Sequence, residues 1–335
     1  MHTSQELRAA VEAAIWAPSV HNTQPWTFAV TDGELSVRAD TDRLLRVSDA
    51  EGREMLVSCG AALFNIRVAV WATGHRPVVR VLPDPDRPGL LATVRLGDRQ
   101  DADEQTLAMN AQIRHRRTHR AGFTRKQVPD ALLETLVAQA RNEGARLTPA
   151  VSEAVVRVLA SVTAAAQDVQ AGDRAFALEM LRWGRPPGSR YRDGVPAGAY
   201  PSEPRRTRPH FPQRDYAGGR ASWGSEEDQR TATAPGVVAV LTTPGDTPPD
   251  WMAAGQALQR VLLHASAHGV SAAFHTQALE LYHLREFVRQ ELCSGEYPQM
   301  IMRLGYPAGE TRAVRRPVSD VLEEFDRPGA EGTCA

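Results

Sequence analysis

The first 40 residues pass from a helical to a strand-like pattern of apolar positions. One apolar stripe at helical spacing contains Leu7, Ala10, Val11, Ala14 and Ile15. Pro18 ends this pattern, and the stretches 26–30 and 35–39 then flank an Asp-Gly pair, which is typical of a tight hairpin turn. The pattern predicts a helix followed directly by a β-hairpin.

The rest of the chain alternates long helical patterns with short strands. We expect helices within 48–74, 103–113, 129–144, 152–182, 250–268 and 279–292, and strands at 78–82, 90–96, 236–243, 270–275 and 300–304. Thr3 with Glu6, and Ser48 with Glu51, have the spacing of capping boxes. Helices mixed with a few strands favour an α/β or α+β fold.

Residues 183–235 break this regularity. The segment is dense in Gly, Pro, Arg, Ser and Tyr and has no clear period. A loop of this length in a compact protein is usually a functional lid or is disordered. We therefore expect it to cover a site or to lack fixed structure.

A weak internal repeat relates the two halves. Gly60-Ala61-Ala62-Leu63 begins a helical stretch that ends at Gly74, and Gly255-Gln256-Ala257-Leu258 begins one that ends at Gly269. The offset is 195 residues in both cases, so the pattern is consistent with a duplicated domain or with chance.

Composition limits the broad class of the protein. The 335 residues are 42% hydrophobic and 24% charged, which is typical of a globular protein of one large or two smaller domains. We expect no transmembrane span, because no run of 18 apolar residues occurs, and no signal peptide. Three scattered cysteines give no disulfide framework, so a cytoplasmic protein is expected. The net charge of −1 gives no global field for nucleic acid or membrane.

The segment from Ala17 to Phe28 is the most specific one in the chain. Ser19, Asn22 and Gln24 offer short polar side chains to a planar heterocycle, and Pro18 and Pro25 stiffen the loop that holds them. The alternative is a well-capped turn next to a buried Trp26. A capped turn would not require this exact combination of residues.

A second segment concentrates positive charge. Between Arg114 and Arg120, six Arg or His side chains and the hydroxyl of Thr118 fill seven positions. Guanidinium forks match phosphate oxygens, so a monophosphate site is one interpretation. A solvated helix end and a nucleic-acid patch are the others. A third basic cluster, Arg312, Arg315 and Arg316, could close on the same phosphate.

Other chemistry has little support in the sequence. Two His pairs at helical spacing, 115/119 and 264/268, have no intervening Glu, so we expect no metal site. No GxSxG elbow, P-loop or GxGxxG occurs. We assign no catalytic residue.

Together the two segments resemble the flavin-dependent nitroreductase family. Its members carry an Arg-Arg-Ser-x-Arg stretch, matched here by residues 116–120, and an Ala-Pro-Ser-x-x-Asn-x-Gln-Pro-Trp stretch, matched by 17–26. Residues 269–277, 304–307 and 315–317 resemble later blocks of the family. In that family, FMN binds between two subunits of an intertwined dimer. One subunit supplies the basic residues for the phosphate, and the other supplies the Pro-Ser loop that faces the flavin.

The order of the motifs departs from the usual one, because the Pro-Ser loop precedes the Arg motif by about 100 residues. This order resembles the Acg-type subfamily, in which two modules are fused and one FMN sits in a pseudo-dimer under a lid. The resemblance implies an α+β fold with antiparallel-rich mixed sheets flanked by helices. It implies a first module at 1–108 and a second at 109–335, with the lid at 183–235. A monomeric pseudo-dimer and a homodimer both remain open.

The resemblance also implies a function. An FMN-dependent oxidoreductase would pass electrons in a ping-pong cycle from NAD(P)H or another donor to a small organic acceptor, or dehydrogenate a substrate with oxygen as acceptor. The alternative is a non-enzymatic protein that sequesters FMN under its lid. The residues implied for the phosphate are Arg116, Thr118, Arg120, Arg315 and Arg316. Those implied for the ring or the ribityl chain are Pro18, Ser19, Asn22, Gln24, Thr276 and Gln277.

Overall fold

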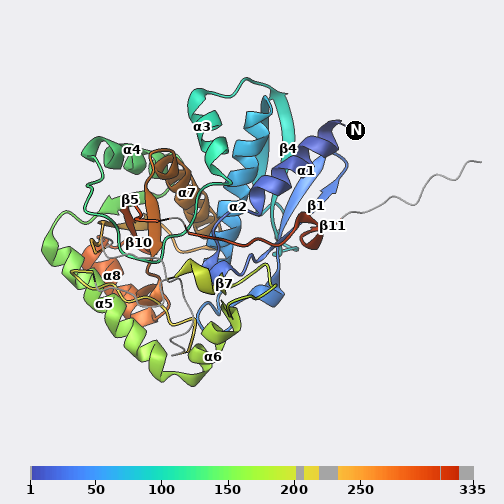
Figure 1. The fold of residues 1–335 in the computed structure, drawn as a ribbon. Helices are drawn as coiled ribbons and strands as arrows, with labels where there is room; N and C mark the ends of the chain where they lie inside the picture. Colours follow the sequence, from blue (N-terminus) through green and yellow to red (C-terminus); the bar gives the residue numbers. More distant parts are fainter. Residues whose placement is uncertain (1, 201–206, 219–232, 310, 324–335) are drawn as a thin grey trace, which may run out of the picture.

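A computed structural model describes residues 2–200, 207–218, 233–309 and 311–323, and places them in two sheet-and-helix halves (Figure 1). The five-stranded sheet of the first half has the order β11-β1-β2-β4-β3. Its strands are β1 (Trp26–Thr31), β2 (Glu34–Ala39), β3 (His75–Val81), β4 (Leu90–Arg99) and β11 (Leu322–Glu323). Two helices, α1 (His2–Ala14) and α2 (Arg53–Ala72), pack together against this sheet.

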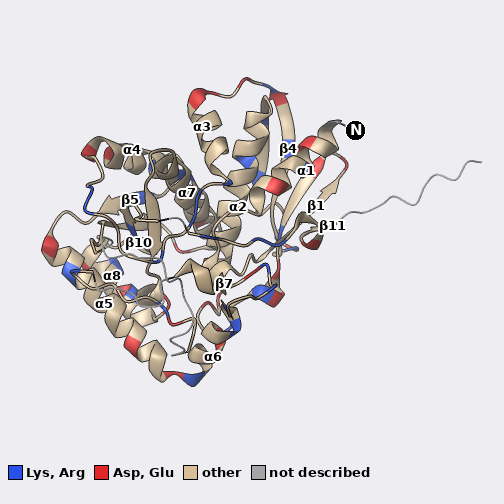
Figure 2. Cartoon of the chain, in the orientation of Figure 1, with Lys and Arg blue, Asp and Glu red and all other residues tan. Residues whose placement is uncertain are grey.

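The second half has a four-stranded sheet in the order β5-β8-β10-β9. Its strands are β5 (Arg146–Pro149), β8 (Val237–Thr243), β9 (Ser271–Phe274) and β10 (Tyr297–Gly305). Its helices are α4 (Asp130–Arg141), α5 (Glu153–Gly172), α6 (Arg174–Trp183), α7 (Pro248–Ala267) and α8 (Tyr282–Leu292). Acidic and basic residues are intermixed over both halves (Figure 2).

Successive side chains along β8, in the second sheet, point into two different cores. Val238 and Val240 of β8 pack into the cluster that contains helix α5, whereas Ala239 and Leu241 join the main core with α2 and α7. This is the period of two that places successive side chains on opposite faces of a sheet. The second sheet is therefore covered by helices on both faces.

The two sheets share one strand order. In the first half, β1-β2-β4-β3 pair antiparallel throughout, as do β5-β8-β10-β9 in the second. A long helix follows the second strand of each set, α2 in one and α7 in the other. The short strand β11 then brings the end of the chain back to β1 as a parallel neighbour.

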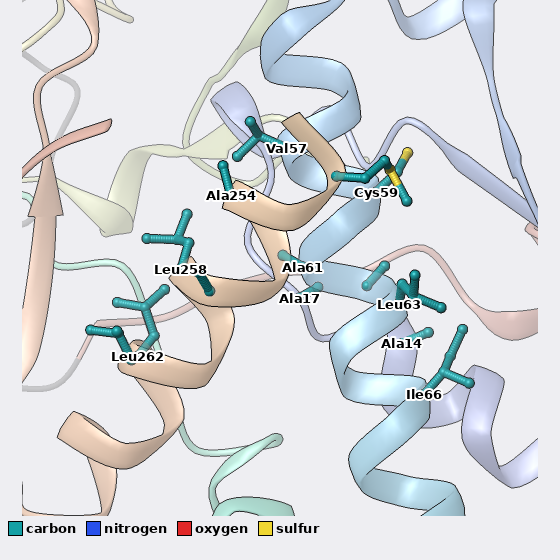
Figure 3. Packing of buried hydrophobic residues seen from close by; sticks show 14 of the residues in the cluster. Ala14, Ala17, Val57, Cys59, Ala61, Leu63, Ile66, Ala254, Leu258 and Leu262 are labelled. Atoms are coloured by element: carbon teal, nitrogen blue, oxygen red, sulfur yellow. The ribbon is translucent and has the colours of Figure 1, made fainter. Parts of the chain in front are cut away.

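Helices α2 and α7 join the halves by direct packing. Figure 3 shows Val57 and Ala61 of α2 beside Ala254 and Leu258 of α7, all within one core cluster. Gly60 and Gly255 let the backbones approach, because a Cβ atom on Gly255 would lie 2.0 Å from the carbonyl oxygen of Val57. Helix α3 (Glu104–Gln112) packs on both α2 and α7, so the expected domain boundary at 108/109 falls inside this helix.

Helix α2 is long and apolar enough to match a membrane span by length and composition, contrary to the expectation from its sequence. However, 78% of its most apolar window is buried inside the protein. We therefore describe α2 as the central core helix of the first half.

Most expected elements are present, with three kinds of correction. The hairpin is confirmed, with Asp32 and Gly33 at positive φ of 51° and 75° in its turn. Both predicted capping boxes are wrong: Thr3 lies inside α1, and the carboxylate of Asp49, not Ser48, accepts the backbone N–H groups of Glu54 and Met55. Strands β5 and β11 were not expected. The irregular segment contains a short parallel pair, β6 (Gly184–Arg185) with β7 (Val195–Pro196).

Candidate functional site

The loop after α1 is held in an unusual backbone conformation. His21, Asn22 and Gln24 all have positive φ, at 45°, 56° and 52°. Non-glycine residues adopt this region rarely and at a cost in free energy, and such strain clusters at functional sites. The Oγ atom of Ser19 accepts the backbone N–H of Gln24 at 2.9 Å and closes the loop. The sequence string 17–26 therefore encodes a rigid, strained loop and not a simple turn.

The arginine segment runs beside β9 of the second half. Thr118 forms a parallel bridge with Ala272, and the N–H of His119 donates to the carbonyl of Ala272 at 2.8 Å. This pairing extends the sheet edge and fixes the direction of the side chains that follow. Thr118 and Arg120 consequently face the strained loop of the first half.

The C-terminal arm brings a third segment to the same place. On its way to β11, the chain passes the strained loop, where Arg315 donates to the Oδ1 atom of Asn22 at 3.0 Å. The backbone N–H of Arg316 donates to Oε1 of Gln24 at 2.8 Å. Segments almost 300 residues apart in the sequence therefore meet at one site.

These segments enclose a main cavity with about 900 Å³ of space outside atoms, open solvent at its mouth included. Its lining includes Pro18, Ser19, Thr118, Arg120, Thr276 and Gln277. The irregular segment contributes Tyr200, Gln213, Arg214 and Tyr216 to the lining of the cavity.

A side cavity of about 360 Å³ adjoins the main one and shares Pro18, Ser19, Thr118 and Arg120 with it. Asn22, Arg312 and Arg315 complete its polar lining. None of the described residues that line it is acidic. The side cavity therefore combines three guanidinium groups with hydroxyl and amide groups, a set that suits an anion.

Two buried arginines near the side cavity, Arg116 and Arg315, have no acidic partner among the described residues. Arg116 is 4% exposed and Arg315 is 8% exposed, and both donate to the single carbonyl oxygen of Trp16. The Nε and Nη1 atoms of Arg116 and the Nε atom of Arg315 have no hydrogen-bond partner among the described residues. A buried charge is costly unless it is paired. These two side chains are therefore arranged to meet an anion.

Electrostatics support this interpretation. Burial, with the neighbouring charges of Arg117 and Arg120, lowers the pKa of Arg116 to about 9. Burial and the charges of Arg116, Arg117 and Arg120 also place the pKa of Arg315 well below its ordinary value. Bound negative charge would relieve both the desolvation and the mutual repulsion.

The structure brings together most of the residues expected at the site. Pro18, Ser19, Thr118 and Arg120 line both cavities, Thr276 and Gln277 line the main one, and Asn22 and Arg315 line the side one. Arg116 lines a third, more open cavity next to residues 307–314. Gln24 and Arg316 line none of these three cavities and bond to each other, so their direct role stays a prediction.

Sequence reasoning missed several residues that line the main cavity. His21 Nδ1 lies 2.9 Å from the hydroxyl of Tyr216, and burial places the pKa of His21 well below its ordinary value. Glu54 and Arg303 also line the cavity. His21 lay within a quoted string, but Tyr216 lies in a segment without periodicity, and Glu54 and Arg303 looked like ordinary helix and strand residues.

An ionic latch fastens the irregular segment to the first half. The carboxylate of Asp193 accepts Arg43 Nη1 at 2.8 Å and Arg185 Nη2 at 2.6 Å. Asn22 and Gly194 also exchange hydrogen bonds across the same junction. The described part of the cover is thus anchored on the strained loop.

We expect Asp193→Ala to loosen this anchor. Hydrogen bonds to charged groups contribute about 1.5–3 kcal/mol each, so local opening should become roughly tenfold more frequent or more. Limited trypsin digestion after Arg190 and Arg192 would measure this, with the exposed Asp86→Ala as control. Cleavage at the rate of the control would contradict the latch.

The pH dependence of the latch has a definite sign. Burial opposes ionisation of Asp193, but hydrogen bonds from Arg43 and Arg185 outweigh it and lower the pKa of this carboxyl. A lowered folded-state pKa gives stabilisation that is present above the unfolded value, near 4, and is lost as the pH falls through the folded value. The latch should therefore persist at neutral pH and open only in acid.

Comparison with known proteins identifies the family. The sequence model of the nitroreductase family matches residues 113–306, more than half of the chain. The chain belongs to the nitroreductase family. A Mycobacterium tuberculosis protein named "Putative NAD(P)H nitroreductase" is 32% identical to this nitroreductase over 96% of this chain and 92% of the relative. A second one, whose name adds "acg", is 27% identical over 96% of each.

Solved nitroreductases are more distant. The protein from Bacteroides fragilis with bound FMN is 15% identical, covers 70% of this chain and 100% of its own, and has a TM-score of 0.38. The enzyme from Mycobacterium smegmatis in complex with NADPH is 19% identical, covers 67% and 100%, and has a TM-score of 0.37. Neither structure indicates the role of any residue in this chain.

Membership confirms the expected α+β nitroreductase fold, the oxidoreductase class and the Acg-type relationship. Membership of the family supports the expectation of FMN as cofactor. The family match begins at residue 113, whereas the two relatives extend over 96% of the chain, so they share the first half as well.

Proposed function

We propose that this nitroreductase binds one FMN across the joined main and side cavities. Arg116, Thr118, Arg120 and Arg315 would hold the phosphate, and Arg312 would add a further charge. Pro18, Ser19 and Asn22 would contact the ribityl chain or the ring, while Thr276 and Gln277 would meet the ring edge. Gln24 and Arg316 would support the strained loop.

The observation that carries this proposal is the pair of buried guanidiniums that have no acidic partner in the described parts of the chain. Arg116 and Arg315 share the carbonyl of Trp16, and three of their guanidinium nitrogen atoms have no hydrogen-bond partner within the described part of the chain. A phosphate dianion supplies oxygen acceptors in the bidentate geometry that arginine prefers. The main cavity shares Pro18, Ser19, Thr118 and Arg120 with the side cavity, so a ligand held by its phosphate in the side cavity would extend into the main one.

When bound, FMN supplies the redox chemistry, in a ping-pong cycle from NAD(P)H or another donor to a small organic acceptor, or to oxygen in a dehydrogenation. The protein's contribution is to bind, orient and shield. His21 and Tyr216 stay uncharged at neutral pH, since burial lowers the pKa of the imidazole and raises that of the phenol. They therefore present a polar but uncharged surface to a small organic molecule.

We further propose that the chain is two fused modules, as expected for 1–108 and 109–335. The matching strand orders and the equivalent positions of α2 and α7 support this. In this arrangement, the first module supplies the strained loop and the second supplies the arginine segment. One site then forms between the modules of a single chain. A cytoplasmic location stays a prediction.

A sequestering protein is the second candidate, and the cover over the main cavity favours it. Tyr200, Gln213, Arg214 and Tyr216 come from the irregular segment and line the main cavity. The described part of the predicted lid at 183–235 includes these four residues, whereas 201–206 and 219–232 lie outside the described residues. A cover that stays closed would hold flavin without turnover.

Absorption spectroscopy tests both candidates. Purified protein should show a flavin band and release about one FMN per chain on heating. An enzyme should then bleach within seconds of adding NAD(P)H, whereas a sequestering protein should bleach only with dithionite. Protein that is colourless and takes up no added FMN would refute both.

A further inference from the structure

One acidic residue lines the main cavity among the described residues. Glu54, in the first turn of α2, is 4% exposed and faces the cavity together with Val57, Ser58, Leu258 and Met300. Neither the sequence motifs nor the flavin-holding groups proposed above use it. A carboxyl group at this place can exchange a proton with a molecule in the cavity.

The charges around Glu54 do not balance when all are ionised. Three carboxyl groups, Asp49, Glu54 and Glu280, interact there with two guanidiniums, Arg53 and Arg214. Full ionisation would leave one uncompensated negative charge in a buried region, which is costly. One bound proton makes the cluster neutral.

Hydrogen bonding decides which carboxyl group keeps that proton. Glu280 is ion-paired with Arg214 and also accepts Thr276 Oγ1 at 2.8 Å and Gln170 Nε2 at 2.9 Å. Asp49 accepts two backbone N–H groups at the start of α2. Donors of this kind stabilise the ionised form of a carboxyl group.

Glu54 receives much less support for its charge. Its Oε1 atom accepts Arg53 Nη2 at 2.8 Å, while Nη1 of the same guanidinium donates to the carbonyl of Gln299 at 2.9 Å. Burial, followed by the charge of Glu280, raises the pKa of Glu54 to about 8, whereas the pKa of Asp49 rises only to about 6. The proton therefore belongs to Glu54 at neutral pH.

We propose that Glu54 is the catalytic acid that delivers a proton to the electron acceptor bound in the main cavity. This inference rests on the proposed flavin-dependent function. A nitro compound takes a hydride from the reduced flavin and the O–H proton of Glu54. It becomes a nitroso compound, and one of its oxygens leaves as water. The carboxylate of Glu54 then recovers a proton from solvent.

The first test needs no variant. Infrared spectra of wild-type protein labelled with ¹³C-glutamate should show the carbonyl band of a protonated carboxyl group at pH 7, and the band should fade as the pH passes about 8. Glu54→Gln should lack the band, and the exposed Glu291→Gln should keep it. Absence of the band at pH 7 from wild-type protein would overturn the proposal.

The second test separates proton delivery from a structural role. Dithionite-reduced holoprotein is mixed with a nitrofuran, and flavin reoxidation is followed by stopped flow. Glu54→Gln should retain wild-type FMN content but reoxidise about 10²–10⁴-fold more slowly, as expected for loss of a general acid. Glu54→Asp should recover part of the rate, and Glu291→Gln all of it.

The pH profile supplies the last criterion. Wild-type reoxidation should slow above about pH 8, where the acid is lost, and Glu54→Gln should show no such slowing. Reoxidation of Glu54→Gln at the wild-type rate, with the wild-type profile, would overturn proton delivery while leaving the proposed function intact. Wild-type protein that binds no FMN would overturn both, and only the infrared result would then stand.

Discussion

Replacing both Arg116 and Arg120 with Ala should lower the affinity for FMN by about 3–6 kcal/mol, or roughly 10²–10⁴-fold. Each guanidinium is expected to make a charged hydrogen bond to the phosphate, which contributes about 1.5–3 kcal/mol. Arg116 is buried and keeps two unbonded N–H groups for this purpose. Titration of flavin-free protein, followed by flavin fluorescence, measures the change.

Riboflavin, which lacks the phosphate, makes this test specific. The double variant should bind riboflavin about as well as the wild type does, because the arginines have no phosphate to hold. Arg76→Ala with Arg80→Ala is a matched control, since both arginines are exposed on β3. Equal losses for FMN and riboflavin would mean that the arginines shape the cavity and do not bind the phosphate.

The flavin-free variant should not be less stable than the flavin-free wild type. Burial and neighbouring positive charges lower the pKa of Arg116 to about 9, so its charge is unfavourable without a bound anion. Removing it relieves both the desolvation and the repulsion, so the thermal unfolding of flavin-free protein should be unchanged or shifted upward. Such a trade of stability for binding is common at functional sites.

The sequence predicted those elements in which a strong local pattern persists over many residues. The hairpin at β1 and β2 and the helices α2 and α7 each have a period or a turn signal that tertiary contacts do not override. The two-residue strand β11 carries no period at all. It forms because the C-terminal arm reaches β1, and no local signal reveals that contact.

The sequence motifs predicted part of the site but not all of its residues. Thr118, Arg120 and Ser19 were found because their neighbours form recognisable strings. Tyr216 was not, because its place in the cavity depends on the path of an irregular segment. Glu54 was not, because an acid in the first turn of a helix is usually a favourable surface residue near the helix dipole. Its function emerges only from burial beside other carboxyl groups.

The crossing of α2 and α7 has a two-fold character. A Cβ atom on Gly60 would meet the carbonyl oxygen of Met252 at 2.4 Å, and one on Gly255 would meet that of Val57 at 2.0 Å. Residues 57 and 252, like 60 and 255, are 195 positions apart in the sequence. Reciprocal contacts of this kind arise where a two-fold axis passes through an interface. In the proposed duplication, the axis would relate the two modules.

Gly255→Ala should therefore destabilise the whole protein, by up to about 2 kcal/mol net. The added methyl group cannot be accommodated 2.0 Å from a backbone oxygen, so the two core helices must move apart. Overpacking of this kind costs about 1–3 kcal/mol, more than the roughly 1 kcal/mol that Ala gains over Gly in helix propensity. Denaturant unfolding followed by circular dichroism would measure the loss.

Gly172→Ala is the matched control, because Gly172 also lies in a helix, at the end of α5, and a Cβ atom there meets nothing within 4 Å. Its stability should be unchanged or slightly higher. The same substitution should thus lower the free energy of unfolding at position 255 but not at position 172, since only Gly255 lies at the contact between the halves. If Gly255→Ala behaved like Gly172→Ala, α2 and α7 could not be packed at the observed distance. The site between the halves depends on that packing, so loss of bound FMN should accompany the loss of stability.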